Sequence, residues 1–163
     1  MNLLTPLRRL AGAPAGPGNR RSREPAGIIE PRDATARLAS FVGRPLGRAD
    51  TSMDRLVVEI STNPVHLLVV AGPLILTSAD GSVAVCHAPG VAVAAVMEWS
   101  GRPITRVEVL PTGGLRIDCG AGNLRVEADP KYEAWEVRGM DGGLLACLPG
   151  GRISLWTPAD NQE

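Results

Sequence analysis

The chain has 163 residues, of which 44% are hydrophobic and 21% are charged, which is typical of one globular domain. Three cysteines form an odd set without a Cys-x-x-Cys pair, which argues against a disulfide framework. Arg8 and Arg9 interrupt the first apolar residues, as a signal peptide would not allow, and no stretch reaches the ~20 apolar residues of a membrane helix. We therefore expect a soluble, cytoplasmic protein with no membrane partner.

Charge is unevenly distributed along the chain, although the net charge is zero. Residues 1–50 hold nine Arg and four acidic residues, a net charge of +5, and residues 51–163 carry −5. Residues 11–33 combine Pro, Gly, Ala and Arg with almost no large apolar side chain, so we expect residues 1–38 to form a disordered arm. Nucleic acid would bind only through this arm, but a solvated tail is favoured because no aromatic residue precedes Phe41.

A single β-rich domain is expected over residues 39–158, followed by a disordered tail at 159–163. Two-residue periodicity, apolar runs and the turns between them predict strands at 56–60, 66–72, 74–78, 82–86, 105–110, 114–119 and 123–128. Asp80-Gly81 is a hairpin signal between two of these strands. One helix is predicted at 90–100, because Pro89 precedes it and Gly101 follows it.

The last two predicted strands carry charges that favour one register. Pairing opposite charges sets Arg116 opposite Glu127 and Asp118 opposite Arg125, on the outer face of the sheet. A slip by two residues would set Arg116 against Arg125. We therefore expect the first register.

The two halves of the domain are similar in pattern. Residues 57–76 and 106–126 each show a strand ending in Val-Glu-apolar, a turn, an apolar strand and Ala-Gly before the next strand. This weak repeat suggests duplication. The predicted fold is α+β and mostly antiparallel, with two β-meanders bridged by the helix at about 90–100.

Residues 129–151 hold the only tyrosine and several carboxylates. A strand over YEAWEV would place Tyr132 and Glu136 on one face, and Glu133 and Trp135 on the other. Glu133 and Glu136 then cannot act together as in a glycosidase. Trp135 is predicted to anchor the core, and Tyr132 to be half-buried with its hydroxyl against the backbone. Gly-rich turns follow, including a tight hairpin turn at Asp141-Gly142.

Motifs for phosphate, zinc or nucleophilic chemistry are not found. The Gly-rich turns match neither the dinucleotide-binding nor the P-loop pattern. Cys86, His87, Cys119 and Cys147 have the composition of a zinc site, but each Cys lies in its own predicted strand, so small buried hydrophobes are favoured. His66 lies in an apolar run and is interpreted as structural. We assign no catalytic residue, metal or cofactor.

One family resembles the C-terminal part of the chain. The residues that carry the resemblance are Asp129-Pro130-Lys131-Tyr132-Glu133-Ala134-Trp135-Glu136, Gly139, Asp141-Gly142, Cys147-Leu148-Pro149-Gly150-Gly151 and Trp156. This pattern resembles an actinobacterial family known as domain of unknown function 6188. The resemblance is good over 123–156, thinner over 56–82, and does not include the arm. It implies a compact domain and brings no assigned activity.

Two function classes remain. The first is a non-enzymatic protein-binding module, immunity- or antitoxin-like, favoured because the acidic body complements a basic partner and no catalytic set is found. Its candidate surface consists of Tyr132, Glu133, Glu136, Arg116, Asp118, Arg125 and Glu127. The alternative is a small-ligand binder or enzyme with a site around Tyr132 and Glu136, joined by His66, which would require these side chains to converge on a pocket between the two meanders.

Overall fold

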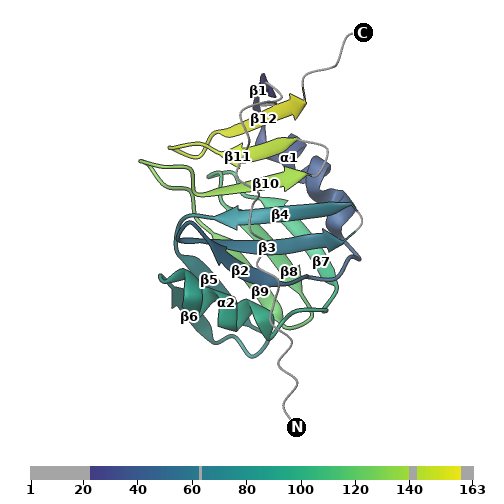
Figure 1. Ribbon diagram of the computed structural model, residues 1–163, viewed down its shortest axis with the longest axis vertical. Helices are drawn as coiled ribbons and strands as arrows, with labels where there is room; N and C mark the ends of the chain where they lie inside the picture. The colour runs from purple at the N-terminus through teal and green to yellow at the C-terminus, as the bar shows by residue number, and fades with distance from the viewer. Residues whose placement is uncertain (1–22, 63, 140–142, 159–163) are drawn as a thin grey trace.

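The computed structural model describes residues 23–62, 64–139 and 143–158, which form two antiparallel sheets and two α-helices (Figure 1). The seven-stranded sheet consists, in spatial order, of β1 (Arg23–Ile29), β12 (Ile153–Pro158), β11 (Leu144–Cys147), β10 (Trp135–Gly139), β4 (Val65–Val70), β3 (Arg55–Thr62) and β2 (Ala49–Ser52). The five-stranded sheet consists of β6 (Val83–Cys86), β5 (Leu74–Ser78), β9 (Gly122–Val126), β8 (Leu115–Cys119) and β7 (Ile104–Val109).

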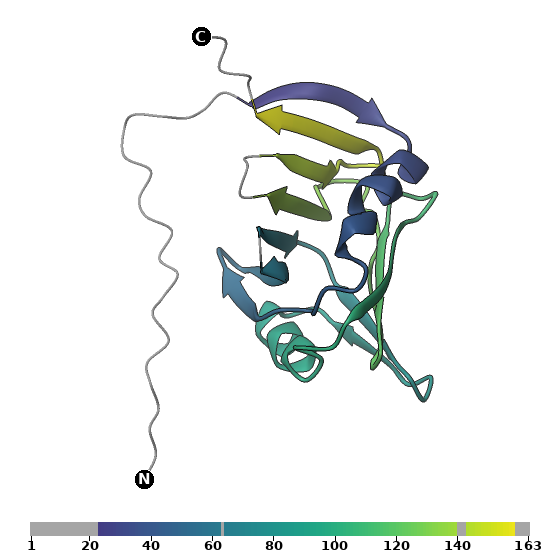
Figure 2. The ribbon, with the colours of Figure 1, turned by 90° about the vertical axis from the view of Figure 1, so that its right-hand side faces the viewer.

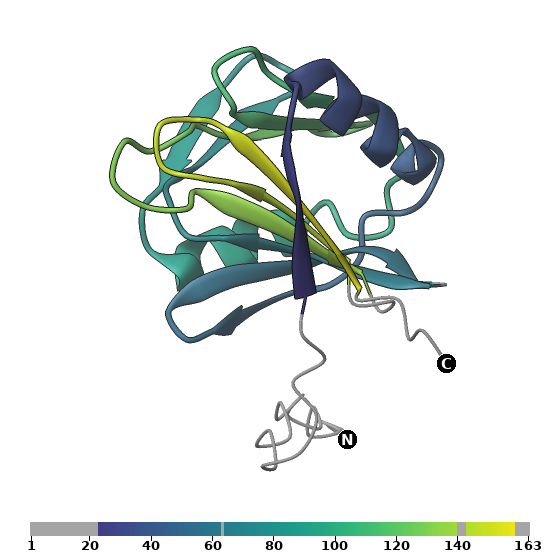
Figure 3. The same cartoon turned by 90° about the horizontal axis from the view of Figure 1, so that it is seen from above.

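The inner faces of the two sheets meet in one hydrophobic core. In β8, Leu115, Ile117 and Cys119 are buried while the residues between them are partly exposed. Trp135 and Val137 of β10 enter the same core cluster from the other sheet. Seen from above, the sheets form two layers (Figure 3). The two-residue periodicity of the sequence is therefore the periodicity of burial against this core.

The helices lie beside the edges of the sheets. Helix α1 (Pro31–Leu38), continued by a short 3₁₀ turn, η1 (Ala39–Phe41), packs against the edge strand β7. Helix α2 (Pro89–Met97) contacts β2 and β3 of one sheet and β6 of the other (Figure 2). Each helix starts with a proline, whose fixed φ suits the first turn. Among the described residues, neither helix is long and apolar enough to cross a membrane.

The predicted fold class is confirmed, because the chain is α+β with two antiparallel sheets. The seven predicted strands are present, and the predicted bridging helix is α2. The predicted meander at 106–126 is formed by β7, β8 and β9. The matching half at 57–76 differs, because β5 pairs with β6 and β9 after the chain crosses between sheets at residues 71–73. The two halves therefore do not share one topology.

The register predicted from cross-strand charges is wrong. The structure pairs β8 and β9 with Arg116 opposite Arg125. Each arginine instead binds a carboxylate two residues along its own strand: Arg116 binds Asp118, and Arg125 binds Glu127. Neighbours i and i+2 share a face of a strand, so the charges are satisfied without constraining the register. The two-residue turn at 120–121 then sets the register.

The N-terminal segment is more structured than expected. Residues 23–38 were assigned to a disordered arm, whereas the structure has β1 paired with β12 and helix α1 there. The reason is that Pro31 starts a helix whose Ala34 and Leu38, four residues apart, are buried in the core. The rest of the predicted arm, the predicted tail at 159–163 and the Asp141-Gly142 turn lie outside the described residues.

Candidate binding surface

The residues predicted to form one binding surface lie in three places. The outer face of the five-stranded sheet holds Arg116, Asp118, Arg125 and Glu127. Tyr132 and Glu133 lie in the loop before β10, and Glu136 lies on the outer face of the seven-stranded sheet. The core separates the two outer faces (Figure 2), so the predicted set does not form one continuous surface.

On β7, β8 and β9, the outer face of the five-stranded sheet carries ion pairs within strands. Each pair joins residues i and i+2: Arg106–Glu108, Arg116–Asp118 and Arg125–Glu127. The Arg116 guanidinium donates to both carboxylate oxygens of Asp118, at 2.7 and 3.2 Å, and these hydrogen bonds raise the pKa of Arg116. The three pairs are balanced in charge, and partly exposed pairs contribute only ~0–1 kcal/mol each. The β7–β9 part of this face therefore has the character of a solvated surface.

The outer face of the seven-stranded sheet is largely apolar. The strand registers form one row of Val57, Val69, Glu136, Ala146 and Ser154, and a second row of Glu59, Leu67, Arg138, Leu144 and Trp156. Val69 and Ala146 are buried, yet they do not belong to the core cluster. An antiparallel sheet with one solvated face normally alternates apolar and polar residues. These strands depart from that alternation.

Glu136 is the most buried of the charged groups on this face. Its neighbours in the row are Val69 and Ala146, and only 6% of the residue is exposed. Arg138, two residues along β10, donates a hydrogen bond to the Glu136 carboxylate. Burial of a carboxylate costs free energy unless a partner compensates for the lost water. Arg138 supplies that partner.

Tyr132 differs from its prediction, because it is 56% exposed and precedes the strand. The Oδ1 atom of Asp129 accepts hydrogen bonds from two backbone N–H groups, that of Lys131 at an N–O distance of 2.7 Å and that of Tyr132 at 3.3 Å. This local turn competes with strand pairing, so β10 begins only at Trp135. Tyr132 and Glu136 therefore do not share a strand face.

Trp135 is confirmed as a core anchor. It is 1% exposed, and its Nε1–H donates to the carbonyl oxygen of Gly113 at 2.9 Å. A Cβ added to Gly151 would lie 2.1 Å from the Thr112 carbonyl oxygen, so the Pro149-Gly150-Gly151 turn packs directly on the 112–113 backbone. The Asp129 carbonyl accepts the N–H of Gly150 at 2.8 Å. Much of the 129–151 segment is thus structural.

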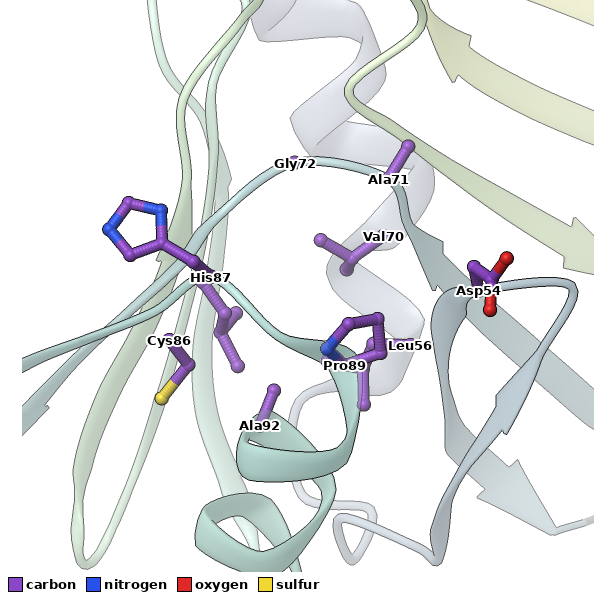
Figure 4. Close-up of a pocket in the computed structure, with 10 residues that line it drawn as sticks. Asp54, Leu56, Val70, Ala71, Gly72, Cys86, His87, Pro89 and Ala92 are labelled. Atoms are coloured by element: carbon purple, nitrogen blue, oxygen red, sulfur yellow. The ribbon is translucent and has the colours of Figure 1, made fainter.

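A small cavity lies where α2 begins, away from Tyr132 and Glu136. Its volume is about 50 Å³, enough for a few waters and well below the ~300–1,000 Å³ of typical ligand sites. Figure 4 shows the Asp54 and His87 side chains at opposite sides, with Leu56, Val70 and Ala92 between them. These polar groups do not converge on a common point.

The cysteines and His66 have structural surroundings. Cys86, Cys119 and Cys147 are free and buried, and burial raises the pKa of Cys147 to about 11, so its thiol stays protonated at neutral pH. His66 Nδ1 lies 3.2 Å from the Pro64 carbonyl, and its ring meets Phe41 edge-on at 5.0 Å. Among the described residues, no three His, Cys, Asp or Glu side chains are grouped so as to hold a metal.

Leu67, Leu144 and Trp156 were not part of the predicted surface. The signal for Leu67 and Leu144 is the apolar run LLVV in β4 and the run LLAC in β11, whereas Trp156 lies in the more polar strand β12. Such runs predict strands that are buried on both faces. In the structure one face of each strand meets the core, and the other is the outer face of the sheet.

A model of a family of unknown function, DUF6188, matches residues 39–157 of this chain. The match starts at η1, so β1 and α1 precede it, and it includes the strands from β2 to β11 and most of β12. No curated protein and no solved structure matches the chain.

Proposed function

We propose that this chain, which belongs to the DUF6188 family of unknown function, is a non-enzymatic protein-binding module. Its contact surface is the outer face of the seven-stranded sheet. The observation that carries the proposal is the contrast between two outer faces of one domain. Balanced ion pairs cover the β7–β9 part of one face, whose exposed valines lie at the β6 edge. The middle of the other face holds half-buried Leu67, Leu144 and Trp156 in strands β4, β11 and β12. Contiguous apolar patches on a soluble domain mark interaction sites.

The composition of the apolar face resembles the centre of a protein interface. Trp156 lies beside Leu144 in the register, and Leu144 lies beside Arg138. Tryptophan and arginine are enriched among residues that dominate binding energy, and a surrounding apolar zone excludes water from them. The Glu136–Arg138 pair adds a fixed charge pattern that a partner must match, which favours specificity.

A basic partner is favoured by the charges at one end of this face. Asp50 and Glu59 lie with Arg55 at its β2–β3 end, a net charge of −1, and residues 51–163 carry −5 overall. The carboxylates of the five-stranded sheet contribute less, because arginines of the same strands neutralise them. An immunity- or antitoxin-like role, in which an acidic rim and an apolar centre cover a basic protein, is one function that fits this surface.

The proposal is tested by photocrosslinking in cells that naturally produce the protein. A photoreactive phenylalanine analogue replaces Trp156 on the apolar face, and in a matched variant it replaces Asn123, which is similarly half-exposed on the charged face. We expect a discrete protein adduct from position 156 and none from position 123. Leu144→Lys in the first variant should abolish the adduct while the protein stays folded. Adducts that form equally at both positions, or none at 156, would contradict the proposal.

A further inference from the structure

The edges of the two sheets differ in how they are protected from pairing with another strand. At β2, the Ala49 N–H contacts the Met97 sulfur of α2 at 3.2 Å. At β7, the Val109 N–H donates to the Thr35 hydroxyl of α1 at 2.9 Å. The edge strand β1 contains Pro25 and a register shift, both of which disfavour further pairing. These are the protective features that exposed edges normally carry.

The fourth edge strand, β6, is contacted by α2, but within the described part of the chain it has no such hydrogen bond at its edge, no proline and no register shift. Its sequence VAVC has no charge and no proline, and its pairing with β5 is regular. Val83 is 63% exposed, Val85 is 52% exposed, and Ala84 between them is also exposed. The β5–β6 hairpin, teal in Figure 2, projects from the lower end of the molecule. An approaching strand can therefore reach this edge.

The hydrogen-bond pattern shows which groups of β6 face outward. The Ser78 N–H donates to the Ser82 carbonyl at 2.8 Å, so residues 78 and 82 form a hydrogen-bonded pair. Such pairs alternate along an antiparallel ladder, so Ala84 also bonds towards β5, and Val83 and Val85 occupy non-hydrogen-bonded positions. The N–H and C=O groups of Val83 and Val85 therefore point to the free edge.

We propose that two copies of this chain pair antiparallel through β6, about a two-fold axis at Ala84. Val83 then lies opposite Val85 of the second copy, and Val85 lies opposite its Val83. Because these residues are the ones whose backbone groups point outward, both pairs become hydrogen-bonded pairs. The two five-stranded sheets join into one continuous sheet, and the contact is isologous, as expected for a homodimer.

Charge and side-chain chemistry favour a second copy as the occupant of this edge. The register pairs valine with valine on the outer face, which is a favourable β-branched cross-strand contact. It also brings the Asp80-Gly81 turn of one copy towards the exposed His87 of the second copy. A hydrogen bond from the Ser82 hydroxyl lowers the pKa of Asp80 and keeps it anionic. No like charges face each other along β6.

The dimer uses a different surface from the protein-binding face proposed above. Strand β6 belongs to the five-stranded sheet, whereas that face belongs to the seven-stranded sheet. Dimerisation would leave both copies of the apolar face accessible. Failure of one proposal therefore leaves the other standing.

The register is tested by a cysteine at the two-fold axis of the full chain. In Ala84→Cys, the two new cysteines face each other in a non-hydrogen-bonded pair, about 4.5 Å apart between Cα atoms, which a disulfide can bridge. We expect oxidation to convert Ala84→Cys to a covalent dimer. The matched variant Val83→Cys should stay monomeric on a non-reducing gel. In the proposed register its cysteine lies opposite Val85 of the second copy and not opposite the second cysteine. The three native cysteines are buried and add little background.

The association itself is tested by sedimentation equilibrium of the wild-type chain. We expect a twofold increase in mass as the concentration rises towards about 1 mM, which detects even weak association. Val85→Lys should remain monomeric, whereas Val91→Lys, at a valine of similar exposure on α2, should dimerise like the wild type. A monomeric wild type, equal crosslinking of the Ala84→Cys and Val83→Cys variants, or loss of dimer in Val91→Lys would overturn the proposal.

Discussion

Gly151 illustrates how a single backbone contact holds the C-terminal turn in place. A Cβ at this position would lie 2.1 Å from the Thr112 carbonyl oxygen, at a φ of +91°. Gly150 has a similar φ of +84°, but a Cβ there would meet nothing within 4 Å. We predict that Gly150→Ala costs about 1 kcal/mol of unfolding free energy, from φ alone, and that Gly151→Ala costs about 3 kcal/mol or more. Urea denaturation measures the unfolding free energy of each variant. Equal losses in the two variants would contradict a close approach of Gly151 to Thr112.

Cys147 makes the stability of the fold sensitive to alkaline pH. Burial raises its pKa from the ordinary 9.0 to about 11, with a smaller contribution from the charge of Glu133. Because the unfolded thiol ionises first, the stabilisation is complete below pH 9 and is lost as the pH rises from about 9 to about 11. We predict that, over this pH interval, the unfolding free energy of the wild type falls by on the order of 1–2 kcal/mol more than that of Cys147→Ala. Parallel pH profiles of unfolding free energy for the two proteins would disprove it.

The environments of the two aromatic residues Trp135 and Tyr132 were predictable from the sequence to different degrees. Trp135 was assigned correctly to the core, because a large apolar side chain in an alternating strand has one favourable place. Tyr132 was not, because the Asp129 side chain captures the backbone N–H groups that would have started the strand. Competition between a side chain and the ladder depends on local geometry that alternation does not encode.

Thr35 connects helix α1 to the edge of the five-stranded sheet. Its hydroxyl accepts the Val109 N–H at 2.9 Å and lies 3.5 Å from the Val109 carbonyl. Thr35→Val keeps the shape but leaves that N–H unpaired, so we predict a loss of about 1–2 kcal/mol of unfolding free energy and faster hydrogen exchange at Val109. The control is Thr105→Val at an exposed position of β7, expected within about 0.5 kcal/mol of wild type. Unchanged exchange at Val109 in Thr35→Val would contradict this role.

Strands and helices with strong local sequence signals were predicted better than elements that depend on tertiary contacts. Alternation and turn signals located the strands from β3 to β9 and helix α2, because each signal lies within a few consecutive residues. Strand β1 and helix α1 were missed, because their few apolar residues, such as Ile29 and Leu38, lie in a polar, proline-containing stretch. Their stability comes from docking on β12 and β7, a tertiary contribution that overrides local composition.

At the level of the whole molecule, the candidate surface depends on the order of strands in space. Its rows run from β3 through β4, β10 and β11 to β12, so strand β10 joins two segments that are far apart in the chain. Sequence periodicity assigns each residue to a face but does not say which strands are adjacent. The predicted surface therefore combined residues such as Arg116 and Glu136, which the fold places on opposite sides of its core.

The N-terminal segment gives a prediction about the integrity of the domain. Removing residues 1–38 would delete β1 and α1, and with them the buried Ala34 and Leu38, which lie before the 39–157 family match. A buried leucine alone contributes ~2–5 kcal/mol to a total of ~5–15 kcal/mol, so we predict a chain with a greatly lowered melting temperature. Removing residues 1–22 keeps every described element and should leave melting unchanged. A test of whether the basic arm binds nucleic acid should therefore use the deletion of residues 1–22. In the deletion of residues 1–38, any loss of binding would follow from unfolding. Equal melting of the two truncated chains would show that β1 and α1 do not support the core.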